Sequence, residues 1–359
     1  VTVGLKDKAE KLMRMALYLD PKNRFVARAA ARFYIHIGDN ERAAEIVRKT
    51  GFSRFDPWLM ASDISIAMMR GKRSGNIKKG QQMIFSSSYT PFSISELASA
   101  LGTVEMEYGT RKKSRDLFNQ SLVDPNDNSL AQAEWAMISA RIPITIQSGL
   151  NVKCSHESKV YKALELNDAR ESIHHAIDWI CDMPFSLKPV FIGYEISTSL
   201  LRDYDLSSNI LGVGLKSHPN DPWMLNNRAY VNARINKLDE AEKDMEQLEH
   251  CNKALSESMS ICKEATHGLI AYRRKDREKG RKLYEQAILR ASTMKENSEE
   301  IKVKAQINML REEIIFSNYQ NTSALMELEQ LVIPNEKLEL VKLRNEVFDE
   351  MKKNEKNQG

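Results

Sequence analysis

The feature that most constrains the fold is a small residue that returns at a nearly constant spacing. Most of these residues are followed, at steps of three and four, by apolar residues on the same helical face. They are Ala9, Ala43, Gly80, Ser114, Ser172, Ser207, Ala241, Gly280 and Ala324. The intervals between them are 34, 37, 34, 58, 35, 34, 39 and 44 residues. Such a period is typical of proteins built from repeated helix pairs.

The clearest unit spans residues 218–249. A turn at 218–222, which contains two prolines, opens a first helix, and the polar residues 236–239 end it. In the second helix Ala241, Met245 and Leu248 share one apolar face. Each such pair is too small to bury its apolar face alone, so neighbouring pairs are expected to stack.

The residue pattern resembles the tetratricopeptide repeat, in which small residues, a large apolar residue and a proline recur at fixed places. The matching residues in the first two units are Ala9, Met13, Ala16 and Pro21, then Tyr34, Gly38, Ala43 and Val47. The resemblance covers most of the chain. It implies an all-α fold, an α-solenoid of stacked antiparallel helix pairs coiled into a right-handed superhelix.

The interval of 58 residues divides this array. Residues 1–141 are predicted to form an N-terminal array of about four helix pairs, the first of them incomplete. Residues 142–153 contain Pro143, Gly149 and several β-branched residues, which predicts an irregular connector. It could be a hinge or a packed crossover. Residues 154–359 are predicted to form a C-terminal array that ends in polar capping helices.

The chain begins at Val1 with a helix of the second type, without a first helix before it. We therefore expect a fragment of a larger, bacterial-type multidomain protein, with an effector domain upstream of Val1.

Several classes of protein are disfavoured by the sequence. It contains no run of about 18 apolar residues and no signal-peptide pattern, and its four cysteines are widely spaced. We therefore expect a cytoplasmic protein that is not embedded in a membrane. No GxSxG, HExxH or CxxC motif occurs, so no catalytic residues, enzyme activity or cofactor are predicted. Possible metal ligands match no familiar zinc spacing, so no metal is predicted; they are Cys154, His156, His174, His175 and Cys181.

Candidate binding residues follow from the resemblance, which implies that first helices line a concave groove. Arg28, Arg32 and His36 would form one cationic stripe there, because they are four residues apart. Guanidinium groups in a groove suit carboxylates or phosphates, although these residues could also be ordinary solvated side chains. The other predicted groove residues are Asn226, Asn227, Tyr230, Arg234, Tyr272 and Arg273.

The leading functional hypothesis is a non-catalytic protein–protein interaction scaffold, or the sensor region of a larger protein, that binds a peptide or helix in the groove. One alternative is binding of nucleic acid or another anion by the N-terminal part, because residues 1–150 carry about +7 and the remainder about −3. Another is the regulatory arm of an enzyme whose catalytic domain lies upstream.

Overall fold

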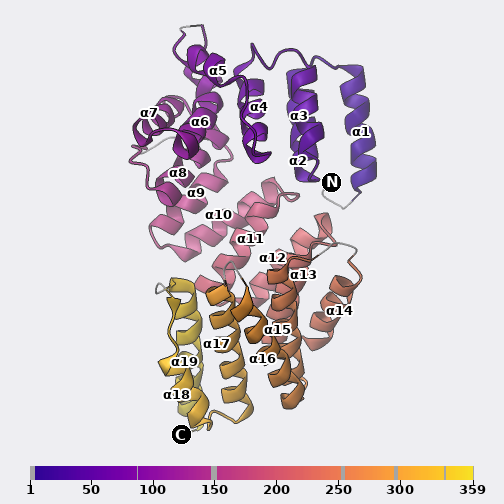
Figure 1. The fold of residues 1–359 in the computed structure, drawn as a ribbon, viewed down its shortest axis with the longest axis vertical. Coiled ribbons are helices and arrows are strands. Elements are labelled where there is room, and N and C mark those ends of the chain that lie inside the picture. Colours follow the sequence, from indigo (N-terminus) through magenta and orange to yellow (C-terminus); the bar gives the residue numbers. More distant parts are fainter. Residues whose placement is uncertain are drawn as a thin grey trace. The chain divides into compact units, whose positions relative to one another are not determined.

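The computed structural model describes residues 5–86, 88–146, 152–251, 255–294, 298–334 and 337–358 (Figure 1), with side chains up to residue 353. Over these residues the chain consists of helices, turns and irregular segments, without a β-strand. It divides into two compact units, Val1–Pro189 and Val190–Gly359. The predicted all-α class is confirmed.

The helices of the first unit are α1 (Lys6–Leu19), α2 (Arg24–His36), α3 (Asn40–Lys49), α4 (Pro57–Met69), α5 (Ile77–Ile84), α6 (Pro91–Tyr108), α7 (Arg111–Ser121), α8 (Asp127–Ala140), α9 (His156–Glu165) and α10 (Ala169–Asp182). Consecutive helices pack as pairs: α2 with α3, α4 with α5, α6 with α7, and α9 with α10. In addition α2 packs on α4, α4 on α6, and α6 on α8. The first helices therefore form one continuous row within this unit.

Helix α11 (Leu187–Glu195) contains the boundary between the units. The second unit continues with a π-helical turn (Ile196–Leu200), α12 (Tyr204–Ser217), α13 (Pro222–Arg234), α14 (Leu238–Glu249), α15 (Glu257–Arg273), α16 (Arg277–Thr293), α17 (Ser298–Phe316), α18 (Thr322–Gln330) and α19 (Leu338–Gln358). Its first helices, α13, α15 and α17, again pack on one another, each next to its partner helix. Both units are thus α-solenoid stacks of helix pairs.

Local sequence explains where the helices begin. Asn23, Asp56 and Asp221 each accept hydrogen bonds from the first backbone N–H groups of the next helix. Pro57 and Pro222 occupy the first turn, where a missing N–H costs nothing.

The repeated small residues lie at the contacts between paired helices. Ala43, Ser114, Ser172, Ser207 and Ala241 are fully buried. A larger side chain at these positions would separate the helices of a pair, so their spacing reflects a packing requirement.

The predicted connector at 142–153 precedes the boundary between the two compact units. Its described residues, 142–146 and 152–153, lie inside the first unit, and α9 packs on α8. Ile142 and Ile144 are buried, and Arg111 of α7 donates hydrogen bonds to the carbonyl oxygens of Ala140 and Arg141 at 3.0 and 2.6 Å. Residues 147–151 lie outside the described part. Among the described residues, the next helix after α8 is α9, which pairs with α10; α8 therefore adds a helix between Ser114 and Ser172, in keeping with the interval of 58 residues.

In the described part of the chain, no helix is both long enough and apolar enough to cross a membrane.

Candidate binding groove

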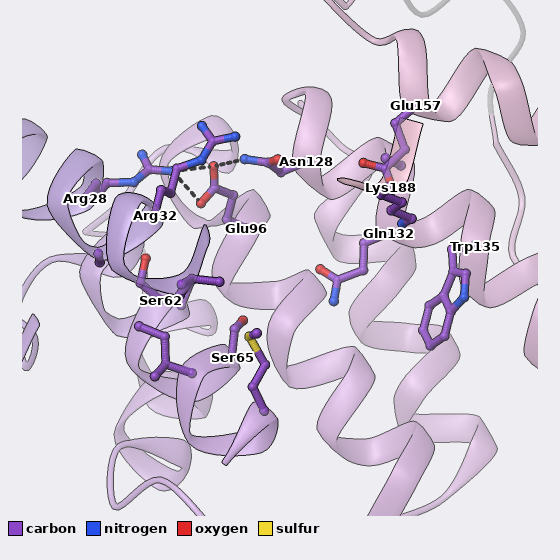
Figure 2. A pocket seen from close by; sticks show the side chains of 16 residues that line it. Arg28, Arg32, Ser62, Ser65, Glu96, Asn128, Gln132, Trp135, Glu157 and Lys188 are labelled. Atoms are coloured by element: carbon purple, nitrogen blue, oxygen red, sulfur yellow. Dashed lines mark hydrogen bonds and ion pairs between the residues drawn. The ribbon is translucent and has the colours of Figure 1, made fainter. Parts of the chain in front are cut away.

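The row of first helices in the first unit borders a pocket of about 390 Å³ (Figure 2). Its lining residues come from α2, α4, α6 and α8, with Glu157 at the start of α9 and Lys188 at the start of α11. This volume is within the usual range for ligand pockets. First helices, which the repeat resemblance expected to line a groove, supply most of the residues around this pocket.

Arg28 lies in this pocket but already has a partner. Its Nη2 is 2.9 and 2.8 Å from the two carboxylate oxygens of Glu96, and its guanidinium carbon is 4.4 Å from the centre of the Trp58 ring. Glu96 also accepts hydrogen bonds from the side-chain amides of Asn126 and Asn128, at 2.7 and 3.2 Å. Arg28 therefore joins α2 to α6, and its charge is largely neutralised.

Arg32, one helical turn further along α2, is exposed. Its Nη2 lies 3.8 Å from the Met183 sulfur, and within the described ranges no carboxylate oxygen lies within 4.0 Å of its nitrogen atoms. Figure 2 shows Arg28 and Arg32 on the same side of the pocket as Glu96. The guanidinium of Arg32 can therefore form a forked contact with an incoming anion.

His36, the third residue of the predicted stripe, is not among the residues that line the pocket. Its ring packs edge-on against Phe185 with 5.2 Å between ring centres. Arg28, Arg32 and His36, which were predicted to form one stripe, therefore lie in three different environments.

Lys188 lies on the opposite side of the pocket, next to Glu157 (Figure 2). The Lys188 ammonium forms an ion pair with Glu157 and lies 5.2 Å from the Tyr161 ring centre and 5.7 Å from that of Trp179. Burial alone would lower the pKa of Lys188, but the Glu157 carboxylate outweighs it and raises the pKa. Lys188 is therefore charged but paired.

The remaining pocket surface is a mixture of apolar side chains and polar groups with internal partners. Ile35, Ile66, Met69 and Trp135 supply the apolar part. Gln132 exchanges hydrogen bonds with the hydroxyl groups of Ser99 and Thr103. A ligand would therefore meet apolar contacts and the cation of Arg32.

Three predicted groove residues of the second unit, Asn226, Asn227 and Tyr230, line a smaller pocket of about 120 Å³. Trp223 also lines it and is 40% exposed. The Tyr230 hydroxyl donates to Asn308 Oδ1 at 3.1 Å. Asn226 Oδ1 is buried and, among the described residues, accepts no hydrogen bond.

The other predicted residues of the second unit are held by carboxylates of later helices. Arg234 Nη2 is 2.7 Å from Glu346 and 3.2 Å from Glu350, both on α19. The Tyr272 hydroxyl donates to Glu313 at 2.5 Å, and Arg273 Nε is 2.7 Å from Glu312, both on α17. These polar side chains therefore form contacts between helices within the second unit.

Sequence reasoning did not identify Ser65, Trp135 or Lys188 as pocket residues. Trp135 lies on α8, which continues the row of first helices, so the repeat pattern could have indicated it. Lys188 lies outside the repeat pattern, and nothing local in the sequence indicated it.

A second cleft in the first unit has a volume of about 930 Å³. Six of its lining residues are basic and one is acidic: Arg48, Arg54, Arg70, Lys72, Arg73 and Lys79, with Asp63. Arg70 and Lys72 pair with Glu41, and Asp63 accepts hydrogen bonds from Ser74 and Asn76. Lys79 lies over the exposed ring of Phe55, 4.1 Å from its centre. This cleft is strongly cationic.

No model of a known protein family and no curated protein matches the sequence. Among solved structures, a tetratricopeptide repeat protein from Parabacteroides merdae ATCC 43184 is similar at a TM-score of 0.33 and 14% identity, over 78% of this chain and 97% of that chain. That similarity is too distant to inform function. The class defined by the structure itself is an all-α protein of stacked helix pairs with a groove along the first helices.

Proposed function

We propose that this chain is a non-catalytic protein–protein interaction scaffold whose first unit binds a peptide or helix carrying an acidic side chain. The observation that carries the proposal is the guanidinium of Arg32, which lines a pocket of both apolar and polar side chains. Within the described ranges, this guanidinium has no carboxylate partner. The neighbouring cations Arg28 and Lys188 are already neutralised by Glu96 and Glu157. The unbalanced charge of the pocket is therefore positive.

The chemistry of the pocket favours a peptide with a carboxylate next to apolar side chains. Trp135, Ile66 and Met69 can cover an apolar side chain, and Met adapts its shape to varied partners. A carboxylate on the ligand would form a charge-assisted hydrogen bond with Arg32. Recognition by a few side chains set on a rigid row of helices is a common mode of peptide binding.

Photo-crosslinking tests where the ligand lies. A photoreactive phenylalanine analogue at Ser65, which lines the pocket, should crosslink to acidic peptides selected from a random library. The same analogue at Lys113, an exposed residue on α7 that is not among the pocket-lining residues, should not. Equal crosslinking at both positions, or none at Ser65, would show that the peptide binds elsewhere.

A second candidate function is the binding of a phosphate-bearing polyanion, such as a nucleic acid, in the basic cleft. The observation that favours it is the excess of cations over carboxylates there. Arg48, Arg54, Arg73 and Lys79 have no ion pair among the described residues. Phe55 offers a flat face on which a base could stack.

Fluorescence polarisation with labelled single-stranded oligonucleotides tests this candidate. Binding should weaken steeply with salt, because each phosphate contact releases a counterion. Arg54→Glu combined with Arg73→Glu should abolish it, whereas Lys112→Glu combined with Lys113→Glu on α7 should have a smaller effect. Absence of binding at low salt would refute the candidate.

A further inference from the structure

Three potential metal ligands meet between α9 and α10, and none of them lines either of the two clefts. One ring nitrogen of His156, one of His175 and a carboxylate oxygen of Asp178 all lie within 4.8 Å of one another. His156 begins α9, and α9 packs against α10, which carries the other two. His175 and Asp178 are three residues apart, so they share one helical face.

Two nitrogen atoms of this cluster are buried and lack partners. His156 Nδ1 and His175 Nδ1 are shielded from solvent and, among the described residues, have no hydrogen-bond partner. His156 Nδ1 is 3.8 Å from Asp178 Oδ2, which is too far for a hydrogen bond. A buried polar atom without a partner destabilises the folded state, so a ligand for these nitrogen atoms would remove that penalty.

The second ring nitrogen of His175 has the partner expected of a metal-binding imidazole. His175 Nε2 lies 3.0 Å from Glu171 Oε1, one turn earlier on α10. A carboxylate that accepts the other N–H is the usual support of a metal-bound histidine, because it fixes the tautomer and the ring orientation. Nδ1 of His175 then carries no proton, and its lone pair is free to bind a metal ion.

From this geometry we propose that His156, His175 and Asp178 bind one divalent first-row transition ion, for which zinc is the test ion. Two imidazoles and one carboxylate suit zinc and its neighbours, whereas calcium and magnesium prefer oxygen ligands. Around a tetrahedral zinc, bonds of about 2.0–2.1 Å place ligand atoms roughly 3.3 Å apart, so a small rotation of these side chains suffices.

The ion would join the first turn of α9 to the second half of α10. Its predicted effect is to stabilise this helix pair by mass action. The cysteines considered earlier, Cys154 and Cys181, are exposed free thiols and are not members of this cluster. The sequence spacing did not identify the site, because Asp178 was not among the residues considered.

Zinc titration of the metal-free, untagged full chain tests the proposal, with a chromophoric chelator as competitor. We expect one zinc ion per chain, with affinity at least tenfold lower in His156→Asn and in His175→Asn. His250→Asn is the matched control and should bind like the wild type, since its ring lies elsewhere, 2.7 Å from the Glu246 carbonyl oxygen. Glu171→Gln should weaken binding by about 10- to 100-fold, as expected for a supporting carboxylate.

Absence of saturable binding by the wild type would overturn the proposal, and so would unchanged affinity in both histidine variants. If His175→Asn fails to fold, His156→Asn and Glu171→Gln still decide, because both side chains lie at or near the surface of the pair. Cobalt(II) absorption gives an independent reading: tetrahedral ligand-field bands should appear in the wild type and be absent in His156→Asn.

Discussion

Glu134 on α8 is a buried carboxyl group in an unfavourable environment. It is 3% exposed, and its Oε2 accepts no hydrogen bond from the described residues. Burial, with a smaller effect of Glu165, raises the pKa of Glu134 to about 7. The folded chain therefore holds this proton more tightly than the unfolded chain does.

This shift predicts a pH-dependent loss of stability. Because the folded pKa exceeds the unfolded value of 4.5, stability falls as pH rises from about 4.5 to about 7 and then levels off. Glu134→Gln removes the ionisable group, so it should stabilise the first unit by about 1–3 kcal/mol at pH 8 and change little at pH 4.5. Urea denaturation at the two pH values measures this difference. An equal effect at both would contradict the raised pKa.

Gly280 on α16 tests the close approach of paired helices. A Cβ atom there would lie 2.5 Å from Cδ2 of Tyr272, whose hydroxyl is fixed by Glu313. Gly280→Ala should therefore destabilise the second unit by about 1–3 kcal/mol in thermal or urea denaturation.

Gly212→Ala is the matched control for Gly280→Ala, because the nearest atom to its new Cβ is Arg228 Nη1 at 3.6 Å. It should be neutral or stabilising, since alanine is the better helix former. Equal losses in the two variants would show that helix contact at Gly280 is not the cause.

At the scale of elements, buried ion pairs join α15 to α17. Glu312 on α17 is almost fully buried and accepts hydrogen bonds from Arg273 on α15 and from Arg311 beside it, at 3.0 and 2.9 Å. Burial would raise the pKa of Glu312, but the two guanidinium groups outweigh it and lower the pKa. Its contribution to stability is therefore present above the unfolded pKa of 4.5 and is lost as pH falls through the lower folded pKa.

Glu312→Gln should destabilise the second unit by about 3–5 kcal/mol at pH 7, because Arg273 and Arg311 lose their counterion in a buried site. Glu242→Gln provides the exposed comparison: Glu242 pairs with Arg274, both more than 40% exposed, and should cost less than about 1 kcal/mol. Urea denaturation of both variants measures the difference. The effect of Glu312→Gln should diminish below pH 4.5, and a cost that does not change with pH would argue against the charge as its source.

The helices and the ion pairs between them were not equally predictable from the sequence. Ala241, Met245 and Leu248 lie at fixed local steps, so the second helix of that pair could be predicted from 3.6-residue periodicity alone. The partners of Arg234 and Arg273 could not, because Glu346 and Glu312 lie far along the chain. Such pairings depend on which helix faces which after stacking.

At the scale of the whole molecule, the repeat period predicted the fold class. It also predicted a connector at 142–153, which precedes the boundary at Pro189 and Val190 between the two compact units. Repeat spacing records where small residues recur, but a compact unit is defined by how densely its helices pack. Ile142 and Ile144 are buried beside α8, so the start of the irregular segment, residues 142–146, belongs to a packed region.

The predicted groove residues on α2 differ in their surroundings, and the sequence alone could not show this difference. Arg28 and Arg32, two residues of the predicted stripe, both line the pocket. The sequence could not show that Glu96 neutralises Arg28 while Arg32 keeps its charge free of any carboxylate in the described chain. This difference makes Arg32 the informative residue, because Arg28→Glu would also place two carboxylates together and disturb α6.

The most direct test of the central claim is the affinity of an acidic, library-selected peptide for the wild type and for Arg32→Glu, measured by isothermal titration calorimetry. We predict that Arg32→Glu weakens binding by about 10- to 100-fold, the cost of losing one charge-assisted hydrogen bond. Arg14→Glu, which makes the same charge change at an exposed position on α1, should leave affinity nearly unchanged. Equal affinity of wild type and Arg32→Glu would contradict a groove in which Arg32 anchors the ligand.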